Sequence, residues 1–96
     1  MKIAHLILAH SKPQQLSRLI ASLIHENAYF FIHIDKKTLI DDFLFLKKIK
    51  NLHFIEKRVK VYWGEYSIVQ ATINSFEEIL NTGIEFGYVN LLSGQD

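Results

Sequence analysis

Four short groups of residues could contact a ligand, and each follows an apolar or alternating run. They are residues 10–11, Asp35, residues 62–64 and residues 93–96. In an open α/β sheet, ligands sit outside the carboxyl ends of the parallel strands. If the runs before these groups are strands of one such sheet, the four groups lie along one edge, the last of them only if its strand is parallel to the others.

Asp35 is the clearest of these candidates. It follows a strongly apolar run and stands about 25 residues after the first such run, where nucleotide-binding βαβ units place an acid that accepts hydrogen bonds from ribose or base. An acid after a strand is more often a turn or helix cap, here for Lys36, Lys37 and Thr38. Spacing alone leaves both roles open. The chain has no G-x-G-x-x-G or Walker A pattern, which disfavours a dinucleotide or P-loop site.

Trp63 and Gly64 are the second candidate. A large aromatic beside a glycine lets the backbone approach a planar ligand while the indole supplies a wall. The alternative is core or rim packing, which is the commoner role of a single Trp at a strand end.

The five histidines do not predict a metal site. None of them forms an i, i+4 pair, and the chain has no cysteine. We expect His5 and His33 to be packed within strands. His10 falls in the expected ligand crevice, where it either contacts a diphosphate or sugar or serves the turn. The basic residues 57, 58 and 60 either steer an anionic ligand or form a solvated face.

The elements that must position these residues alternate between strand and helix. Apolar runs predict strands at 3–9, 29–34, 52–55 and 88–92, and residues 59–63 alternate like a half-exposed extended segment. Helical spacing predicts helices at 12–26, from Thr38 onward, and at 67–80. Strand, helix and strand within about 34 residues favour a right-handed βαβ unit. The expected fold class is therefore α/β and Rossmann-like, with a mostly parallel sheet and flanking helices.

Finer predictions concern helix ends and faces. Ser11 with Gln14, Thr38 with Asp41 and Ser67 with Gln70 match capping signals. The second helix should bury Leu39, Phe43, Leu46 and Ile49. The third should bury Ile68, Ala71, Thr72, Phe76, Ile79 and Leu80 and leave Glu77 and Glu78 in water.

Bulk composition restricts the function further. Ninety-six residues with 49% hydrophobic content suit one domain over residues 1–96, and a net charge of +1 gives no field that would gather nucleic acid. No apolar stretch approaches the roughly 20 residues of a membrane span. We expect a cytoplasmic location, with peripheral attachment to the inner membrane face as the alternative. Because the last strand leads into a loop where the sequence ends, we expect a truncated piece of a longer protein.

Four blocks give the chain a family resemblance. They are residues 4–10, 31–37, 61–67 and 90–96, which read AHLILAH, FIHIDKK, VYWGEYS and NLLSGQD. In this order and spacing, they resemble the amino-terminal portion of the core-2/I-branching and peptide O-xylosyltransferase family, known as glycosyltransferase family 14. The blocks cover nearly the whole chain.

The resemblance implies the nucleotide-binding half of a GT-A-type glycosyltransferase. Such an enzyme transfers GlcNAc or xylose from UDP to an acceptor hydroxyl with inversion. In relatives UDP contacts the positions of Leu8, Asp35 and residues 61–63. His10, Gly64 and Asp96 are added because they are expected at the same edge of the sheet. The candidate substrate-binding residues are therefore Leu8, His10, Asp35, Val61, Tyr62, Trp63, Gly64 and Asp96.

The resemblance also implies which parts of the chemistry lie elsewhere. Relatives work without a divalent metal, so no cofactor beyond the UDP-sugar donor is expected, and no D-x-D motif occurs here. Their diphosphate-binding bases and general base lie downstream of the matched blocks, so no catalytic residue is assigned and the 96 residues alone are expected to be inactive. The expected acceptor is a glycan, a lipooligosaccharide or a protein.

Two other function classes remain open. The chain could be a non-catalytic α/β binding or assembly module that pairs with a separately encoded remainder, which its bare final strand and apolar content favour. A receiver-type regulatory domain ranks last, because residues 10–12 read His-Ser-Lys where such a domain needs an acidic cluster.

Overall fold

A parallel sheet forms the centre of the chain in the computed structural model, which describes residues 1–62 and 66–94. The strands are β1 (Ile3–Ala9), β2 (Ala28–Ile34), β3 (Leu52–Phe54) and β4 (Tyr88–Ser93). Their order in the sheet is β3-β2-β1-β4, and every neighbouring pair is parallel. β1 and β2 are apolar on both faces because both faces are covered, which confirms the α/β prediction.

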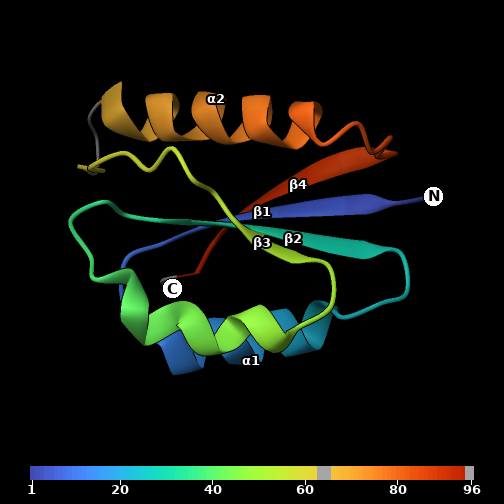
Figure 1. The fold of residues 1–96 in the computed structure, drawn as a ribbon, viewed down its shortest axis with the longest axis horizontal. Helices are drawn as coiled ribbons and strands as arrows, with labels where there is room; N and C mark the ends of the chain where they lie inside the picture. Colours follow the sequence, from blue (N-terminus) through green and yellow to red (C-terminus); the bar gives the residue numbers. More distant parts are fainter. Residues whose placement is uncertain (63–65, 95–96) are drawn as a thin grey trace.

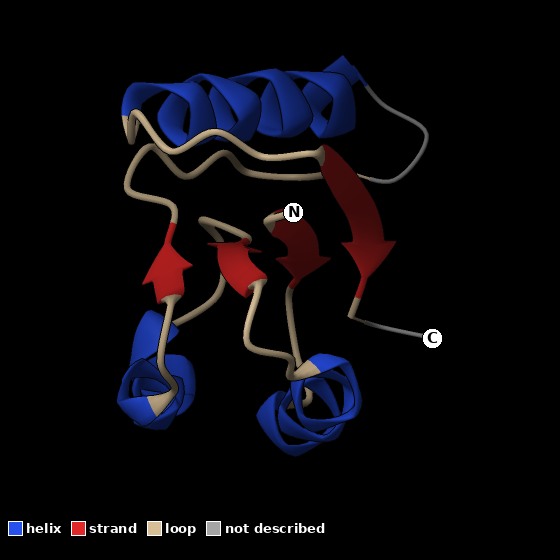
Figure 2. Ribbon diagram, turned by 90° about the vertical axis from the view of Figure 1, so that its right-hand side faces the viewer, coloured by secondary structure: helices blue, strands red, loops and turns tan. Residues whose placement is uncertain are grey.

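Helices lie on both faces of this sheet. The α-helix α1 (Pro13–Leu23) and the 3-10 helix η1 (Ile40–Lys48) cover one face, and α2 (Tyr66–Asn81) covers the other (Figures 1 and 2). The larger core lies between the sheet and α1 with η1, and includes Ile7, Phe30 and Phe43. The smaller core, with Leu6 and Phe31, faces Ile79 of α2. None of the described helices is long and apolar enough to cross a membrane.

Helix boundaries differ from the prediction because backbone geometry ends the helices early. α1 stops at Leu23, since Ile24 is already extended, rather than at residue 26. The second helical segment is a 3-10 helix, and its Leu39 is exposed instead of buried, because Leu39 precedes the helix with extended backbone. Phe43 and Leu46 are buried as predicted, and Ile49 packs against the same core.

The predicted capping boxes at Ser11 and Thr38 are wrong, and the residue before α2 lies outside the described residues. Lys12, in the left-handed conformation with φ 56°, holds the cap position of α1 with no side-chain cap bond, and Leu39 likewise caps η1 without one. The hydroxyl of Thr38 instead donates to the carbonyl of His10 at 2.7 Å. Ser67 uses its hydroxyl to accept the backbone N–H of Tyr62 at 2.9 Å. The Thr38 hydroxyl thus joins two segments distant in sequence, whereas the Ser67 hydroxyl binds the segment that precedes its own helix.

The buried face of α2 is also rotated from the prediction. Ala71 and Ile79 are buried as expected, but the helix also buries Asn74 and Ser75. Phe76 and Leu80, predicted to be in the core, are exposed. Glu78 is half-buried instead of wet, because its carboxylate accepts the backbone N–H groups of residues 56 and 57, each at 2.9 Å.

Candidate functional site

The strand order creates a switch point at the carboxyl ends of β1 and β4. The connection after β1 passes over one face through α1, whereas α2, which leads into β4, lies on the other face (Figure 2). Such switch points are where open α/β sheets bind ligands. Gly94 donates its N–H to the carbonyl of Leu8 at 3.0 Å, so the end of β4 lies directly against the end of β1. A Cβ on Gly94 would meet Leu16 at 3.2 Å and Ile7 at 3.3 Å, so only glycine fits without displacement.

Asp35 is the central polar side chain of this edge. It is 4% exposed, and its N–H donates to the carbonyl of Ala9 at 2.9 Å, which joins the ends of β1 and β2. Its carboxylate oxygen Oδ1 accepts the backbone N–H groups of Lys37 at 2.9 Å and Val61 at 3.2 Å. Oδ2 lies 3.6 Å from the Lys37 ammonium, which is longer than a hydrogen bond. Asp35 therefore fulfils the turn-cap role left open by the sequence, and it does so with one oxygen only.

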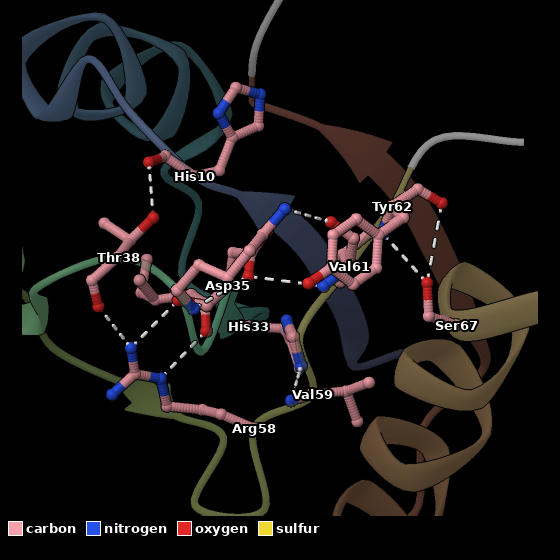
Figure 3. A network of polar contacts seen from close by, with 11 residues as sticks. His10, His33, Asp35, Thr38, Arg58, Val59, Val61, Tyr62 and Ser67 are labelled. Atoms are coloured by element: carbon pink, nitrogen blue, oxygen red, sulfur yellow. Dashed lines mark hydrogen bonds and ion pairs between the residues drawn. The ribbon is translucent and has the colours of Figure 1, made fainter. Parts of the chain in front are cut away.

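Arg58 holds the turn that carries Asp35. Its guanidinium donates to the carbonyls of Ile34 at 2.8 Å, Asp35 at 2.9 Å and Thr38 at 2.6 Å (Figure 3). A guanidinium that satisfies three carbonyls at the end of a strand has a positioning role. Neither expectation for the basic residues, steering of an anion or a solvated face, describes Arg58.

The segment after Arg58 runs along the end of β2 without joining the sheet as a strand. Lys36 donates its N–H to the carbonyl of Val59 at 3.1 Å, and the N–H of Val59 donates to Nε2 of His33 at 3.0 Å. Two residues on, Val61 donates to Asp35. The alternating pattern therefore gives an extended segment, as predicted, whose inward N–H groups are satisfied by side chains of β2 and its following turn.

Tyr62 is placed by contacts on two sides. The ammonium of Lys37 lies 4.0 Å from the centre of the Tyr62 ring and donates to the carbonyl of Val61 at 2.7 Å. The backbone N–H of Tyr62 donates to Ser67 in the first turn of α2. Tyr62 nevertheless remains 51% exposed, so its ring borders the site without being buried in it.

These residues line a small hollow with a cavity volume of about 20 Å³, which is partly open to solvent. Its lining is Leu8, Ala9, His10, His33, Asp35, Val61 and Ile68. Four of the predicted site residues therefore meet, namely Leu8, His10, Asp35 and Val61. Tyr62 lies beside them. Trp63, Gly64 and Asp96 were also predicted, and they lie outside the described residues.

Three features of the site were not predicted from sequence. His33 was expected only to be packed in a strand, but it also lines the hollow. It shares a sheet face with Asp35 because side chains alternate along a strand, a signal that the i, i+2 spacing carries. Ile68 was expected to be buried on α2, not to border a site. The side-chain contacts of Lys37 with Val61 and Tyr62 were not predicted either, since they depend on the path of residues 59–62.

Burial shapes the electrostatics of the two strand histidines. His33 is 1% exposed, and desolvation lowers the pKa of its imidazole, partly opposed by its own backbone carbonyl and by Asp35. Burial also lowers the pKa of His5, which stacks on Phe30. Both rings are thus neutral near pH 7. Across residues 1–62 and 66–94, no three His, Asp or Glu side chains gather as metal ligands would.

The fold is that of an α/β protein with a hollow at the carboxyl edge of a parallel sheet, lined by four apolar residues, two histidines and one carboxylate. The model of the family "Branch: Core-2/I-Branching enzyme" matches residues 3–96. The chain therefore belongs to the Core-2/I-Branching enzyme family, as its four sequence blocks predicted.

Curated relatives agree with this assignment at low identity. The chain is 26% identical over 89 residues to xylosyltransferase 2 of Rattus norvegicus, and this match covers 85% of the chain and 10% of the relative. It is 24% identical over 103 residues to a xylosyltransferase of Ciona intestinalis, covering 100% of this chain and 12% of the relative. It is 25% identical to the xylosyltransferase oxt of Drosophila melanogaster, and this match covers 100% of this chain and 11% of the relative. The chain thus spans about a tenth of the length of these relatives.

Proposed function

We propose that this chain is the nucleotide-binding part of a glycosyltransferase that takes a UDP-sugar as donor. The observation that carries the proposal is the Asp35 carboxylate, which is buried at the carboxyl edge of the sheet beside the end of β1, with Oδ1 fixed by two backbone N–H groups. Among residues 1–62 and 66–94, the one contact of Oδ2 is the 3.6 Å contact with the Lys37 ammonium. An oriented carboxylate oxygen in a mostly apolar hollow suits the N–H or hydroxyl groups of a nucleoside.

The finer features of the reaction are part of the same proposal. The sugar is of the GlcNAc or xylose type, and it passes with inversion to a hydroxyl of a glycan, lipooligosaccharide or protein acceptor, without a divalent metal. Family membership and the xylosyltransferase relatives support this reading. Residues of this chain would hold and orient the nucleoside, and we assign none of them to the bond-making step.

A titration of UDP by calorimetry tests the proposal with a matched pair of variants. Asp35→Asn keeps an oxygen that can accept from residues 37 and 61 but replaces the second carboxylate oxygen by an amide. Losing a hydrogen bond to a charged group should weaken UDP binding about tenfold or more. Asp42→Asn, an exposed acid on η1, should bind like the wild type.

The possible results distinguish an error about the role of Asp35 from an error about the proposed function. Equal UDP affinity in the wild type and Asp35→Asn would remove Asp35 from the site. A wild-type chain that binds no UDP while its circular dichroism shows a folded α/β protein would contradict the proposed function.

A second function, the non-catalytic assembly module, is favoured by one observation. Large apolar side chains of α2 and β4 that are exposed lie around one surface hollow, namely Val69, Ile73 and Leu91. Contiguous exposed apolar surface marks interaction sites or incomplete domains. Light scattering after size exclusion should show a defined complex if the module pairs with another chain, whereas polydisperse aggregates would count against it.

A further inference from the structure

The Nδ1 atom of His33 is a buried polar atom that has no hydrogen-bond partner among the described residues, because even the carbonyl of His33 itself, which acts on the pKa of the ring, lies outside hydrogen-bond geometry. Buried polar groups in folded proteins are nearly always paired, and an unpaired one costs free energy. His33 is also a lining residue of the hollow that contains Asp35. The unpaired Nδ1 atom therefore belongs to a residue of the candidate site.

The protonation state of this ring follows from its other nitrogen. Nε2 accepts the N–H of Val59 at 3.0 Å, so it carries the lone pair. Because burial keeps the ring neutral, the single proton must be on Nδ1. His33 thus presents an N–H donor, and Figure 3 shows this nitrogen on the side of the ring away from Val59, toward Asp35 and Val61.

His33 and Asp35 form a donor and acceptor pair on one sheet face. They are two residues apart at the end of β2, so their side chains point the same way. The Nδ1–H group donates and Oδ2 of Asp35 accepts. A pyrimidine base with a ring N–H beside a carbonyl carries the complementary pair.

We propose that Nδ1–H of His33 donates to a carbonyl oxygen of the pyrimidine base, which makes His33 a specificity-determining residue of the nucleotide site. The inference rests on the proposed function and extends it to a residue that the sequence placed only in a strand. Nδ1 is covered in this structure. Half-buried Leu8 and Val61, which line the same hollow, are the side chains that would make way as the ring enters.

Two substitutions test the roles of the two ring nitrogens of His33 separately. His33→Gln places an amide oxygen near Nε2, so it keeps an acceptor for Val59 but removes the Nδ1 donor. His33→Asn places an amide N–H near Nδ1 and removes the acceptor. Urea unfolding of each variant shows whether the fold is retained.

The binding experiment is a thermodynamic cycle that combines one substitution in the protein with one substitution in the ligand. UDP, 2-thio-UDP and 4-thio-UDP are titrated against the wild-type chain and against His33→Gln, because sulfur is a weak hydrogen-bond acceptor. We expect one thio analogue to bind the wild type about three- to tenfold more weakly than UDP. His33→Gln should bind UDP more weakly by a similar factor, and the same thio substitution should then have little further effect.

Other outcomes overturn the proposal. If His33→Gln binds UDP like the wild type and only His33→Asn is weakened, His33 acts solely by holding Val59. If the effects of the variant and of both thio substitutions are additive, Nδ1 does not contact the base. If the folded wild type binds no UDP, it is the proposed function that fails, and this result is distinct from both others.

Discussion

Arg58 shows how one side chain can determine where a ligand-facing residue lies. Its three donated hydrogen bonds hold the carbonyls of residues 34, 35 and 38, so the turn that carries Asp35 is tied to the segment that covers it. Lys37 makes a second link from the same turn to the carbonyl of Val61. The position of the carboxylate thus depends on cations that need not touch a ligand.

Replacing Arg58 by Met should therefore affect both stability and binding. The change keeps much of the aliphatic stem but leaves three carbonyls without their donor, and we expect the free energy of unfolding to fall by about 2 kcal/mol or more. UDP binding should weaken as well, because the turn at Asp35 loosens. Urea denaturation and calorimetry measure the two effects. Lys60→Met, at an exposed position of the same basic run, should change stability by less than about 0.5 kcal/mol.

The two buried histidines predict how stability depends on pH. Burial holds the pKa of His33 and His5 below the ordinary value of about 6.5 that they regain on unfolding. The unfolded chain therefore binds more protons as the pH falls through 6.5, and the native state loses stability there. Above that pH the contribution is fully present. Urea midpoints at pH 7.5 and 5.5 should differ, and the difference should shrink in His33→Gln. An unchanged slope would show that His33 does not contribute.

At the residue scale, the sequence predicted positions that depend on strand ends. Asp35 and His10 follow from the rule that ligands meet the carboxyl edge of a parallel sheet, Leu8 was predicted from the family resemblance, and the structure brings the three together. Lys37 and the donor role of His33 depend on how residues 58–62 fold back over β2. No local pattern encodes that path.

At the scale of elements, α2 differs most from its prediction. Periodicity favoured the larger apolar residues as the buried face, including Phe76 and Leu80, yet the helix faces the sheet with Ala71 and Ser75. Small residues let the helix approach the strands closely, and the hydroxyl of Ser75 is satisfied by the carbonyl of Ala71 at 2.7 Å. Asn74 accepts from Gln70 at 2.7 Å. Because both polar groups are paired within the helix, burying them costs little.

Adjacent substitutions on α2 test this orientation. Ile79 is 2% exposed and packs in the core with Leu6 and Phe31, so Ile79→Ala should cost about 2–5 kcal/mol of unfolding free energy. Leu80 is 77% exposed, so Leu80→Ala should cost less than about 1 kcal/mol. Chemical denaturation of the two variants measures the contrast. Similar losses in both would show that the helix is rotated toward its larger apolar residues.

At the scale of the whole molecule, the sheet order distributes stability unevenly. β1 pairs with β2 on one side and β4 on the other, whereas β3 and β4 each have one neighbour among the described strands. β1 and β2 also carry most of the fully buried side chains, while Tyr88, Val89 and Leu91 of β4 are exposed. Regions with few buried contacts open at lower free energy than the core.

Hydrogen exchange should therefore follow the sheet order. Amide protons of β1 and β2 should exchange most slowly, near the limit set by global unfolding, and those of β4 and of the amino-terminal turn of α2 should exchange earlier. Saturating UDP should slow exchange mainly at residues 59–62 and in the turn after β2, since ligand binding stabilises the native contacts that form its site. Mass spectrometry after a deuterium pulse, with and without UDP, measures both patterns. Without UDP, equal protection of all four strands would contradict the expected order of exchange. With UDP, protection confined to the opposite end of the sheet, around His25 and Asn51, would place the nucleotide away from Asp35.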